Sequence, residues 1–426
     1  MDRLTDIYNK FRSCSGFTTD SRQIEAGQMF FCLKGANFNG NKFAAEALEK
    51  GAAFVLIDEE EYFTDVRMIL VEDVLRTMQD LARFHRRKFD IPVLGITGTN
   101  GKTTTKELVY AVLSRKYKTH ATKGNFNNHI GVPITLLSMP DDTEFAIIEM
   151  GANHPGEIAE LCAIAEPDYG IITSIGKAHL EGFGSLQGVI NTKNELYQWV
   201  RSVDGMLFVN AGNPLLMELS EGIKRRTYGS GPEADIRGEL LLHDAFVGLR
   251  YAQHEIISQL VGSYNFDNMM AAVCTGNYFE VPDEVIADAL RSYRPQNQRS
   301  QFTDTGKNRV VLDAYNANPT SMMAALESFR QAGAEAKVVI LGDMLELGAE
   351  REKEHRAIVE QLQAMNFEQV ILVGPEFVKA ARDTGFLAFD KNTEALEYLK
   401  EHPIKDRLIL LKGSRGIAVE ILLEAL

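Results

Sequence analysis

The fold is decided by the stretch Gly98-Thr99-Asn100-Gly101-Lys102-Thr103-Thr104. It follows an apolar run at residues 91–96 and precedes a helix-forming segment at residues 106–113. A buried strand, a glycine-rich turn and a helix, in this order, predict a phosphate-binding loop, because turn amides and the positive helix end converge on an anion. Lys102 would reach the outer phosphates and Thr103 would offer its hydroxyl to Mg²⁺. The stretch therefore indicates an ATP site.

The spacing of this loop departs from the standard pattern. That pattern places a glycine five residues before Gly101, where this chain has Ile96. The plainer alternative is a glycine turn with one exposed lysine. The strand before the turn and the helix after it favour the phosphate loop.

Composition narrows the classes of function. The 426-residue chain has 45 Lys and Arg against 59 Asp and Glu, a net charge of −14 at pH 7. This balance argues against a nucleic-acid partner, so anionic ligands would be held in local basic pockets. The four cysteines are far apart and show no CxxC spacing, and they are expected to be reduced core residues.

The N-terminal residues show no apolar signal region, and no run of about 18 apolar residues occurs in the sequence. These observations predict a cytoplasmic protein without a membrane span. We expect it to act as a monomer.

Turn signals and apolar runs divide the chain into three predicted domains. Residues 1–84 have short strand-like runs and form a small α/β module. Residues 85–296 alternate strands with helices, which predicts a mostly parallel sheet, finished by antiparallel strands between about residues 235 and 260. After a polar linker, residues 297–426 repeat the alternation as a second nucleotide-type sheet. The predicted class is a three-domain α/β protein.

Two polar residues follow apolar strands of the central region. Glu149 ends one strand and His179 lies just beyond another. Ligands of parallel α/β sheets bind at the carboxyl ends of the strands, and a carboxylate there suits Mg²⁺. The alternatives are a glutamate that makes a turn hydrogen bond and a solitary structural histidine.

Several segments match, in order, the motifs of one family. They are residues 98–104, Gly124-Asn125-Phe126-Asn127-Asn128-His129-Ile130-Gly131-Val132-Pro133, Glu149-Met150-Gly151, His179-Leu180-Glu181-Gly182-Phe183 and Lys193-Asn194-Glu195. Together they resemble the Mur ligases, which are ATP-dependent amide ligases that work through an acyl phosphate.

Motifs in the other two domains extend this resemblance. They are Asp20-Ser21-Arg22, residues 31–35, residues 312–322, residues 341–348 and Lys412-Gly413-Ser414-Arg415. The C-terminal motifs are most similar to the branch that adds D-alanyl-D-alanine to UDP-N-acetylmuramoyl-tripeptide. The resemblance implies an N-terminal UDP-muramoyl-binding domain, a central P-loop ATP domain and a Rossmann-like C-terminal domain that closes on ATP and binds the acceptor.

The resemblance also implies roles for individual residues. Lys102 and the loop amides, including Gly98, Thr99, Asn100, Gly101 and Thr104, would hold the ATP phosphates. Thr103 and Glu149 would bind one Mg²⁺ and His179 would help to bind a second. Lys193 matches a lysine that the family carbamylates into a further Mg²⁺ ligand, whereas its position alone would suggest an exposed helix lysine. Catalytic roles are thus implied for Lys102, Glu149, His179 and Lys193.

The remaining implied contacts concern nucleotide and substrates. Asn268 would lie near the adenine, Asp313 would take the ribose and Arg299 a phosphate; a plain turn residue is the alternative for Asp313. Substrate contacts are implied for Ser21, Arg22, Lys34, Asn125, Asn128, Tyr315, Asn316 and Asn318. Tyr264 stands where relatives often have histidine, and Asn39-Gly40-Asn41 replaces a common Asp-Gly-His.

Two alternatives stay open at this point. One is another ligase of the same superfamily, such as a different muramyl peptide ligase or a folylpolyglutamate synthetase. The other is a module that closes on ATP without chemistry. The third residue of the tripeptide, lysine or diaminopimelate, is not determined by the sequence.

Overall fold

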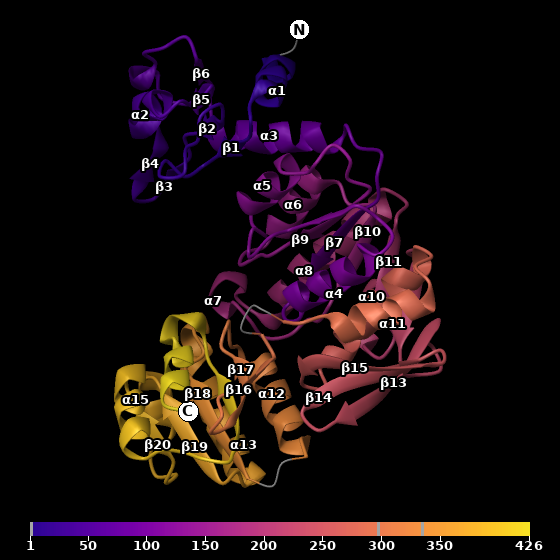
Figure 1. Cartoon of the computed structure of the whole chain (residues 1–426), viewed down its shortest axis with the longest axis vertical. Coiled ribbons are helices and arrows are strands. Elements are labelled where there is room, and N and C mark those ends of the chain that lie inside the picture. The colour runs from indigo at the N-terminus through magenta and orange to yellow at the C-terminus, as the bar shows by residue number, and fades with distance from the viewer. Residues whose placement is uncertain (1–2, 296–298, 334–335) are drawn as a thin grey trace. The chain divides into compact units, whose positions relative to one another are not determined.

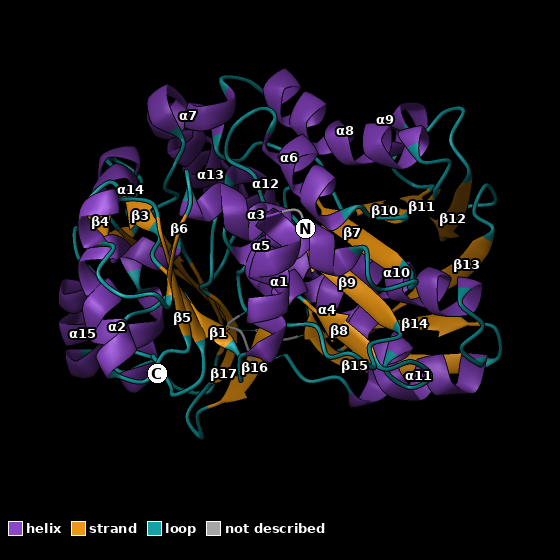
Figure 2. Ribbon diagram, turned by 90° about the horizontal axis from the view of Figure 1, so that it is seen from above, coloured by secondary structure: helices purple, strands orange, loops and turns teal. Residues whose placement is uncertain are grey.

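The computed structural model describes residues 3–295, 299–333 and 336–426. By compactness the chain divides into two units. The first comprises residues 1–95, 118–151 and 159–168, and the second comprises residues 96–117, 152–158 and 169–426. Helices and strands alternate along the chain (Figures 1 and 2). This arrangement confirms the predicted α/β class.

The N-terminal module has a parallel four-stranded sheet with the strand order β1-β2-β5-β6. Its apolar core includes Phe30, Val55 and Ile57, which come from the predicted strand runs. A short hairpin, β3–β4, lies outside this sheet. The elements are α1 (Arg3–Ser13), β1 (Phe17–Thr18), β2 (Met29–Phe31), β3 (Lys34–Gly35), β4 (Phe38–Asn39), α2 (Ala44–Glu49), β5 (Phe54–Ile57), β6 (Met68–Leu70) and α3 (Val74–Arg86).

The largest sheet has the strand order β15-β14-β13-β12-β11-β10-β7-β9-β8. Strands β10 to β13 pair in parallel, and β13, β14 and β15 pair antiparallel, as the sequence predicts. The strands are β7 (Val93–Thr97), β8 (Thr119–Ala121), β9 (Phe145–Glu149), β10 (Tyr169–Ile172), β11 (Met206–Asn210), β12 (Arg225–Gly229), β13 (Ile236–His243), β14 (Phe246–Tyr251) and β15 (His254–Val261). The helices are α4 (Lys102–Leu113), α5 (Gly131–Leu137), α6 (Glu157–Ala165), α7 (Leu180–Phe183), α8 (Leu186–Ser202), α9 (Pro214–Leu219), α10 (Asn265–Tyr278) and α11 (Asp283–Ser292).

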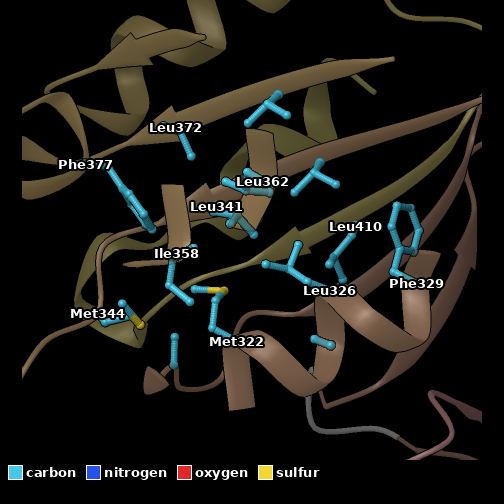
Figure 3. Close-up of a cluster of buried hydrophobic side chains, with 14 of the residues drawn as sticks. Met322, Leu326, Phe329, Leu341, Met344, Ile358, Leu362, Leu372, Phe377 and Leu410 are labelled. Carbon is cyan, nitrogen blue, oxygen red and sulfur yellow. The ribbon is translucent and has the colours of Figure 1, made fainter. Parts of the chain in front are cut away.

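The C-terminal part is a six-stranded sheet with the order β16-β17-β21-β18-β19-β20, parallel except for β16. Two apolar clusters pack against it, and Figure 3 shows the one that joins Met322 and Leu326 of α12 to Leu341 and Leu410 of the sheet. The elements are β16 (Gln301–Asp304), β17 (Arg309–Asp313), α12 (Pro319–Gln331), β18 (Lys337–Gly342), α13 (Arg351–Met365), β19 (Gln369–Val373), α14 (Pro375–Ala380), β20 (Leu387–Phe389), α15 (Asn392–Glu401) and β21 (Leu408–Lys412).

Short 3₁₀ turns complete the described structure at Gly40–Phe43, Glu60–Tyr62, Gly348–Glu350, Arg415–Ile417 and Val419–Glu424. Within the described ranges, no helix is both long and apolar enough to cross a membrane. The predicted domain boundary after residue 84 falls in the last turn of α3, and the boundary between residues 296 and 297 lies outside the described residues. The exact domain limits stay a prediction.

Candidate active site

The phosphate loop joins β7 to α4, as predicted. Gly98 and Gly101 have φ angles of 145° and 84°, values that side-chain-bearing residues rarely adopt. A Cβ on Gly98 would lie 2.1 Å from the hydroxyl of Thr173, and one on Gly101 would lie 2.6 Å from the amide oxygen of Asn268. Both positions therefore require glycine, because Thr173 and Asn268 of the same chain leave no room for a side chain. Ile96 is fully buried within β7, so the residue at the missing glycine position belongs to the strand.

The loop is held in shape from the end of β10. The amide of Thr99 donates to the carbonyl of Ser174 at 2.8 Å, and the amide of Asn100 donates to the Ser174 hydroxyl at 3.0 Å. The Thr173 hydroxyl donates to the Asn100 carbonyl at 2.5 Å. A loop fixed in this way loses little conformational freedom when it receives an anion.

Lys102 opens α4, where its ammonium group lies over the loop. Its Nζ donates to the carbonyls of Gly98 at 2.7 Å and Thr99 at 3.1 Å. The next two residues, Thr103 and Thr104, are buried at the start of the helix. The positive helix end and the lysine together form an anion-binding arrangement.

Lys193 lies on α8 with only 2% of its surface exposed, so the reading as an exposed helix lysine is wrong. Its Nζ donates to the Ala152 carbonyl at 3.4 Å and lies 5.3 Å from the ring centre of Phe183. Burial, and to a smaller extent the charge of Lys102, lowers the pKa of Lys193 to about 7. At pH 7, therefore, Lys193 is an uncharged amine in roughly half of the molecules.

Glu149 ends β9 in the first compact unit and is 1% exposed. Its carboxylate accepts a hydrogen bond from the Asn127 side chain at 2.8 Å, and its amide donates to the Thr122 hydroxyl at 3.0 Å. A Cβ on Gly151 would lie 2.9 Å from the Asn127 side chain. Two separate sequence motifs thus meet at this carboxylate.

His179 pairs with a carboxylate from the loop that follows β18. Its Nδ1 lies 2.5 Å from a carboxylate oxygen of Glu346, and this hydrogen bond lowers the pKa of Glu346. Both residues have left-handed backbones, with φ angles of 49° and 63°. Nearby, Lys177 forms an ion pair with the buried Glu354 at 2.6 Å. Sequence reasoning missed both partners, because neither pairing is visible in the order of residues.

Asn268, implied to contact adenine, packs against the phosphate loop. Its side-chain oxygen accepts from the Thr105 hydroxyl at 3.0 Å, and its nitrogen donates to the Asn265 side chain at 2.8 Å. Tyr264 stands where relatives often have histidine. Its hydroxyl and the Ser300 hydroxyl share a hydrogen bond of 2.9 Å. The tyrosine therefore joins α10 to the segment that enters β16.

Asp313 ends β17 and forms an ion pair with Lys412 at 2.6 Å. The Lys412 side chain is only 1% exposed, and its Nζ also donates to the Asn316 carbonyl at 3.3 Å. Arg299 lies over the ring of Tyr315, 3.8 Å from its centre. Lys412 was noted only as part of a family motif, although a lysine at the end of the apolar strand β21 is itself a signal of a buried charged contact.

The implied substrate residues fall into three groups, in the N-terminal module, near α5 and before α12. In the N-terminal module, Ser21 is buried, Arg22 pairs with Asp20 at 2.8 Å, and Lys34 pairs with Asp58 at 3.1 Å. Asn41, which replaces the histidine of the common Asp-Gly-His, is fully buried there, and its side chain donates to Asp58 at 2.8 Å.

Near α5, the Asn128 side chain accepts from the Gly131 amide at 2.8 Å, and Asn125 is exposed. Asn318 caps α12 through the Ser321 amide at 2.9 Å, and Asn316 accepts from the Ala317 amide at 2.9 Å. Asn128, Asn316 and Asn318 thus shape the loops that carry them. Of the four cysteines, which are all free, Cys32, Cys162 and Cys274 are buried as expected.

Comparison with known proteins agrees with this geometry. Three family models match: the Mur ligase family catalytic domain at residues 13–88, the Mur ligase middle domain at residues 96–276 and the Mur ligase glutamate ligase domain at residues 298–415.

Two curated relatives are named UDP-N-acetylmuramoyl-tripeptide–D-alanyl-D-alanine ligase. The Bacillus subtilis protein is 36% identical, over 95% of this chain and 91% of its own length. The Escherichia coli protein is 31% identical, over 100% and 98%.

Solved structures show the same likeness. MurF from Acinetobacter baumannii has a TM-score of 0.88 at 29% identity, covering 99% of this chain and 97% of its own. MurF from Thermotoga maritima in complex with ADP has a TM-score of 0.86 at 26% identity, covering 100% and 98%. The chain therefore belongs to the Mur ligase family of ATP-dependent amide ligases, as the motifs predict.

Proposed function

We propose that this protein joins D-alanyl-D-alanine to UDP-N-acetylmuramoyl-tripeptide at the expense of ATP, in the cytoplasmic stage of peptidoglycan precursor synthesis. The observation that carries the proposal is the end-to-end match to relatives of that name, at 36% and 31% identity. The preformed phosphate loop and the buried Lys193 give this match a physical basis.

The reaction needs two steps. The terminal carboxylate of the tripeptide attacks the γ-phosphorus of ATP, which gives an acyl phosphate and ADP. The amine of D-alanyl-D-alanine then attacks the acyl carbon, and the tetrahedral intermediate loses a proton and expels phosphate to leave the amide. Lys102 and the amides at the start of α4 would stabilise charge on the transferred phosphoryl group, and the fixed loop would align it.

Mg²⁺ fits the chemistry of the proposed ligands. The hydroxyl of Thr103 and the carboxylate of Glu149 are hard oxygen donors, and Mg²⁺ takes few protein ligands beside phosphate and water. In the described part of the chain, no group of three or more His, Cys, Asp or Glu side chains is arranged to hold a metal. Bound Mg²⁺ would neutralise phosphate charge. A second ion at His179 would compete with the Glu346 contact.

Carbamylation of Lys193 is supported by its burial. A carbamate forms when an uncharged amine reacts with CO₂, and a pKa of about 7 supplies that amine at neutral pH. We expect protein exchanged into ¹³C-bicarbonate to show a carbamate resonance that is absent from Lys193→Arg. A spectrum without this resonance, from an active protein, would show that Lys193 works as a free amine.

Substrate contacts complete the proposal. Ser21, Arg22 and Lys34 would bind the UDP-linked substrate, and Asn125 and Asn128 would contact its muramoyl tripeptide part. Tyr315, Asn316 and Asn318 would face the acceptor, while Asn268, Arg299 and Asp313 would contact the nucleotide. For Asp313 this requires that it share its carboxylate with Lys412.

A phosphate-release assay tests the function. The protein is given ATP, Mg²⁺ and UDP-N-acetylmuramoyl-tripeptide, with either D-alanyl-D-alanine, a single amino acid or no amine. We expect sustained release only with the dipeptide, matched by formation of the pentapeptide product. Release with a single amino acid would identify a different Mur ligase or a folylpolyglutamate synthetase-like enzyme. Tight ATP binding without release would identify a non-catalytic module.

A further inference from the structure

The phosphate loop contacts the start of α12, the helix that follows the proposed acceptor segment at residues 315–318. Asn318 is the N-cap of this helix: its side-chain oxygen accepts from the Ser321 amide at 2.9 Å. The Ser321 hydroxyl lies 3.1 Å from the Asn318 amide, which completes a capping box. The position of Asn318 is thus fixed by its own helix.

The Asn318 side chain also pairs with Asn100 of the phosphate loop. Its nitrogen donates to the Asn100 side-chain oxygen at 2.8 Å, and the Asn100 nitrogen donates back to the Asn318 oxygen at 3.4 Å. Asn318 is 7% exposed, so water competes poorly for these bonds. On the other side, the backbone of Asn100 is fixed by Thr173 and Ser174.

A second contact runs beside the first. The Thr99 hydroxyl accepts from the Gly176 amide at 3.0 Å, and it donates to the Gly176 carbonyl at 3.2 Å. A Cβ on Gly176 would lie 2.6 Å from the hydroxyl of Thr320, which accepts from the Lys177 amide at 3.2 Å. Thr99 therefore reaches the first turn of α12 indirectly, through the segment of Gly176 and Lys177, while Asn100 contacts the N-cap of the same helix directly.

We propose that Asn100 and Asn318 form a positioning pair that couples the nucleotide loop to the acceptor segment. This inference rests on the proposed function, because it assigns the coupled ligands as ATP and D-alanyl-D-alanine. A shift of the Asn100 side chain on binding triphosphate moves the hydrogen-bond partner of Asn318, and through the cap it moves the first turn of α12. By reciprocity, occupation of the acceptor segment stabilises the nucleotide-binding form of the loop.

Two asparagines that act independently would give a different result from two that act as a pair. If Asn100 served only the nucleotide and Asn318 only the acceptor, each substitution would weaken its own ligand, and the two effects would multiply. If the two side chains act as a pair, either substitution breaks the same contact, and the second adds little to the first.

The variants are Asn318→Ser, Asn100→Ala and the double variant. Serine caps a helix about as well as asparagine but lacks the reach and the donor needed to meet Asn100. Asn213→Ser is the matched control, because Asn213 caps α9 through the Leu216 amide and has no part in the site. Two constants are measured for each: the Kd of a non-hydrolysable ATP analogue without acceptor, and the KM for D-alanyl-D-alanine.

We expect Asn318→Ser to raise the Kd of the ATP analogue about threefold when it is the only substitution. In a protein that already has Asn100→Ala, we expect it to leave this Kd unchanged. For the acceptor we expect each single variant to raise KM about three- to tenfold, and the double variant to equal the larger of the two. Asn213→Ser should match the wild type in both.

Multiplicative effects in both constants, or an unchanged Kd in Asn318→Ser, would overturn the pair. The nucleotide measurement needs no acceptor, so it decides the inference even if wild-type protein releases no phosphate with D-alanyl-D-alanine. That last result would instead contradict the proposed function.

Discussion

Two turns in the second compact unit join a parallel strand to a helix, and they satisfy the helix amides differently. The turn between β7 and α4 starts its helix at Gly101 without a side-chain cap. The turn between β19 and α14 is filled by Asp343, whose carboxylate accepts from the amides of Glu376 and Phe377 at 2.9 Å each. A Cβ on Gly374 would lie 2.3 Å from that carboxylate.

The two turns differ in the source of the anion that would meet the helix start. The first turn has helix-end amides without a side-chain cap, together with Lys102, whereas the second receives a carboxylate from its own chain. Burial raises the pKa of Asp343, and the two amide hydrogen bonds and the nearby His355 oppose that rise. The same order of strand, turn and helix thus leaves the helix start without a side-chain cap in one place and supplies a carboxylate to it in the other.

Among these variants, Lys102→Ala should have the largest effect on the function of the turn between β7 and α4. Removing the positive group at the transferred phosphate is expected to slow phosphate release by about a hundredfold to a thousandfold. Steady-state assays at saturating substrates check this, with circular dichroism to confirm folding. Retained turnover would contradict the role of the loop.

Gly98→Ala should damage the same turn through shape alone. The added Cβ meets the Thr173 hydroxyl at 2.1 Å, and the φ angle of 145° is unfavourable for alanine. We expect the Kd of an ATP analogue to rise about tenfold to a hundredfold. Gly231→Ala is the control, because nothing lies within 4 Å of its Cβ position. Equal affinities in the two variants would show that the loop adapts to the side chain.

Asp343→Asn should affect stability and not nucleotide binding. The amide group presents only one oxygen to the two backbone N–H groups, so one of them loses its partner. The expected cost is about 2 kcal/mol in the free energy of unfolding, measured by urea denaturation. Asp304→Asn, at the exposed end of β16, is the control. If instead the ATP-analogue Kd changed and stability did not, the second turn would not be structural.

The smallest expected effect concerns a buried base in the first unit. His85 is 1% exposed, and burial, aided by the charge of Arg12, lowers its pKa to about 4. Its Nδ1 shares a 2.9 Å hydrogen bond with the Tyr8 hydroxyl.

Because the unfolded chain takes up a proton at this histidine near pH 6.5 and the folded chain does not, stability falls as the pH is lowered. Between pH 6.5 and 5.5 His85 should contribute a loss of about 1 kcal/mol. Urea unfolding at the two pH values measures it: the loss should shrink in His85→Gln and persist in His402→Gln, which alters an exposed histidine. An unchanged loss in His85→Gln would exclude His85 as its source.

The strands and the phosphate loop could be predicted because their signals are local. Apolar runs of four to six residues become buried parallel strands, as in β9, β18 and β21. The loop glycines are visible for the same reason.

Side-chain partners could not be predicted in this way. Asp343 and Phe377, His179 and Glu346, and Asp313 and Lys412 are each far apart in the sequence. The burial of Lys193 was equally hidden, because a lysine on a helix carries no local sign of the side that it faces. Only the resemblance to the family singled it out.

The pair of Asn100 and Asn318 consists of neutral amides, unlike the neighbouring contacts of Lys177 with Glu354 and of His179 with Glu346. Dissolved ions screen attraction between charges, with a Debye length that falls from about 10 Å at 0.1 M salt to about 3 Å at 1 M. Partly exposed ion pairs therefore weaken in concentrated salt, while an amide pair keeps its strength. At high ionic strength the link between the nucleotide loop and α12 would rest on its neutral contacts, which are this asparagine pair and the hydrogen bond of the Lys177 amide to Thr320.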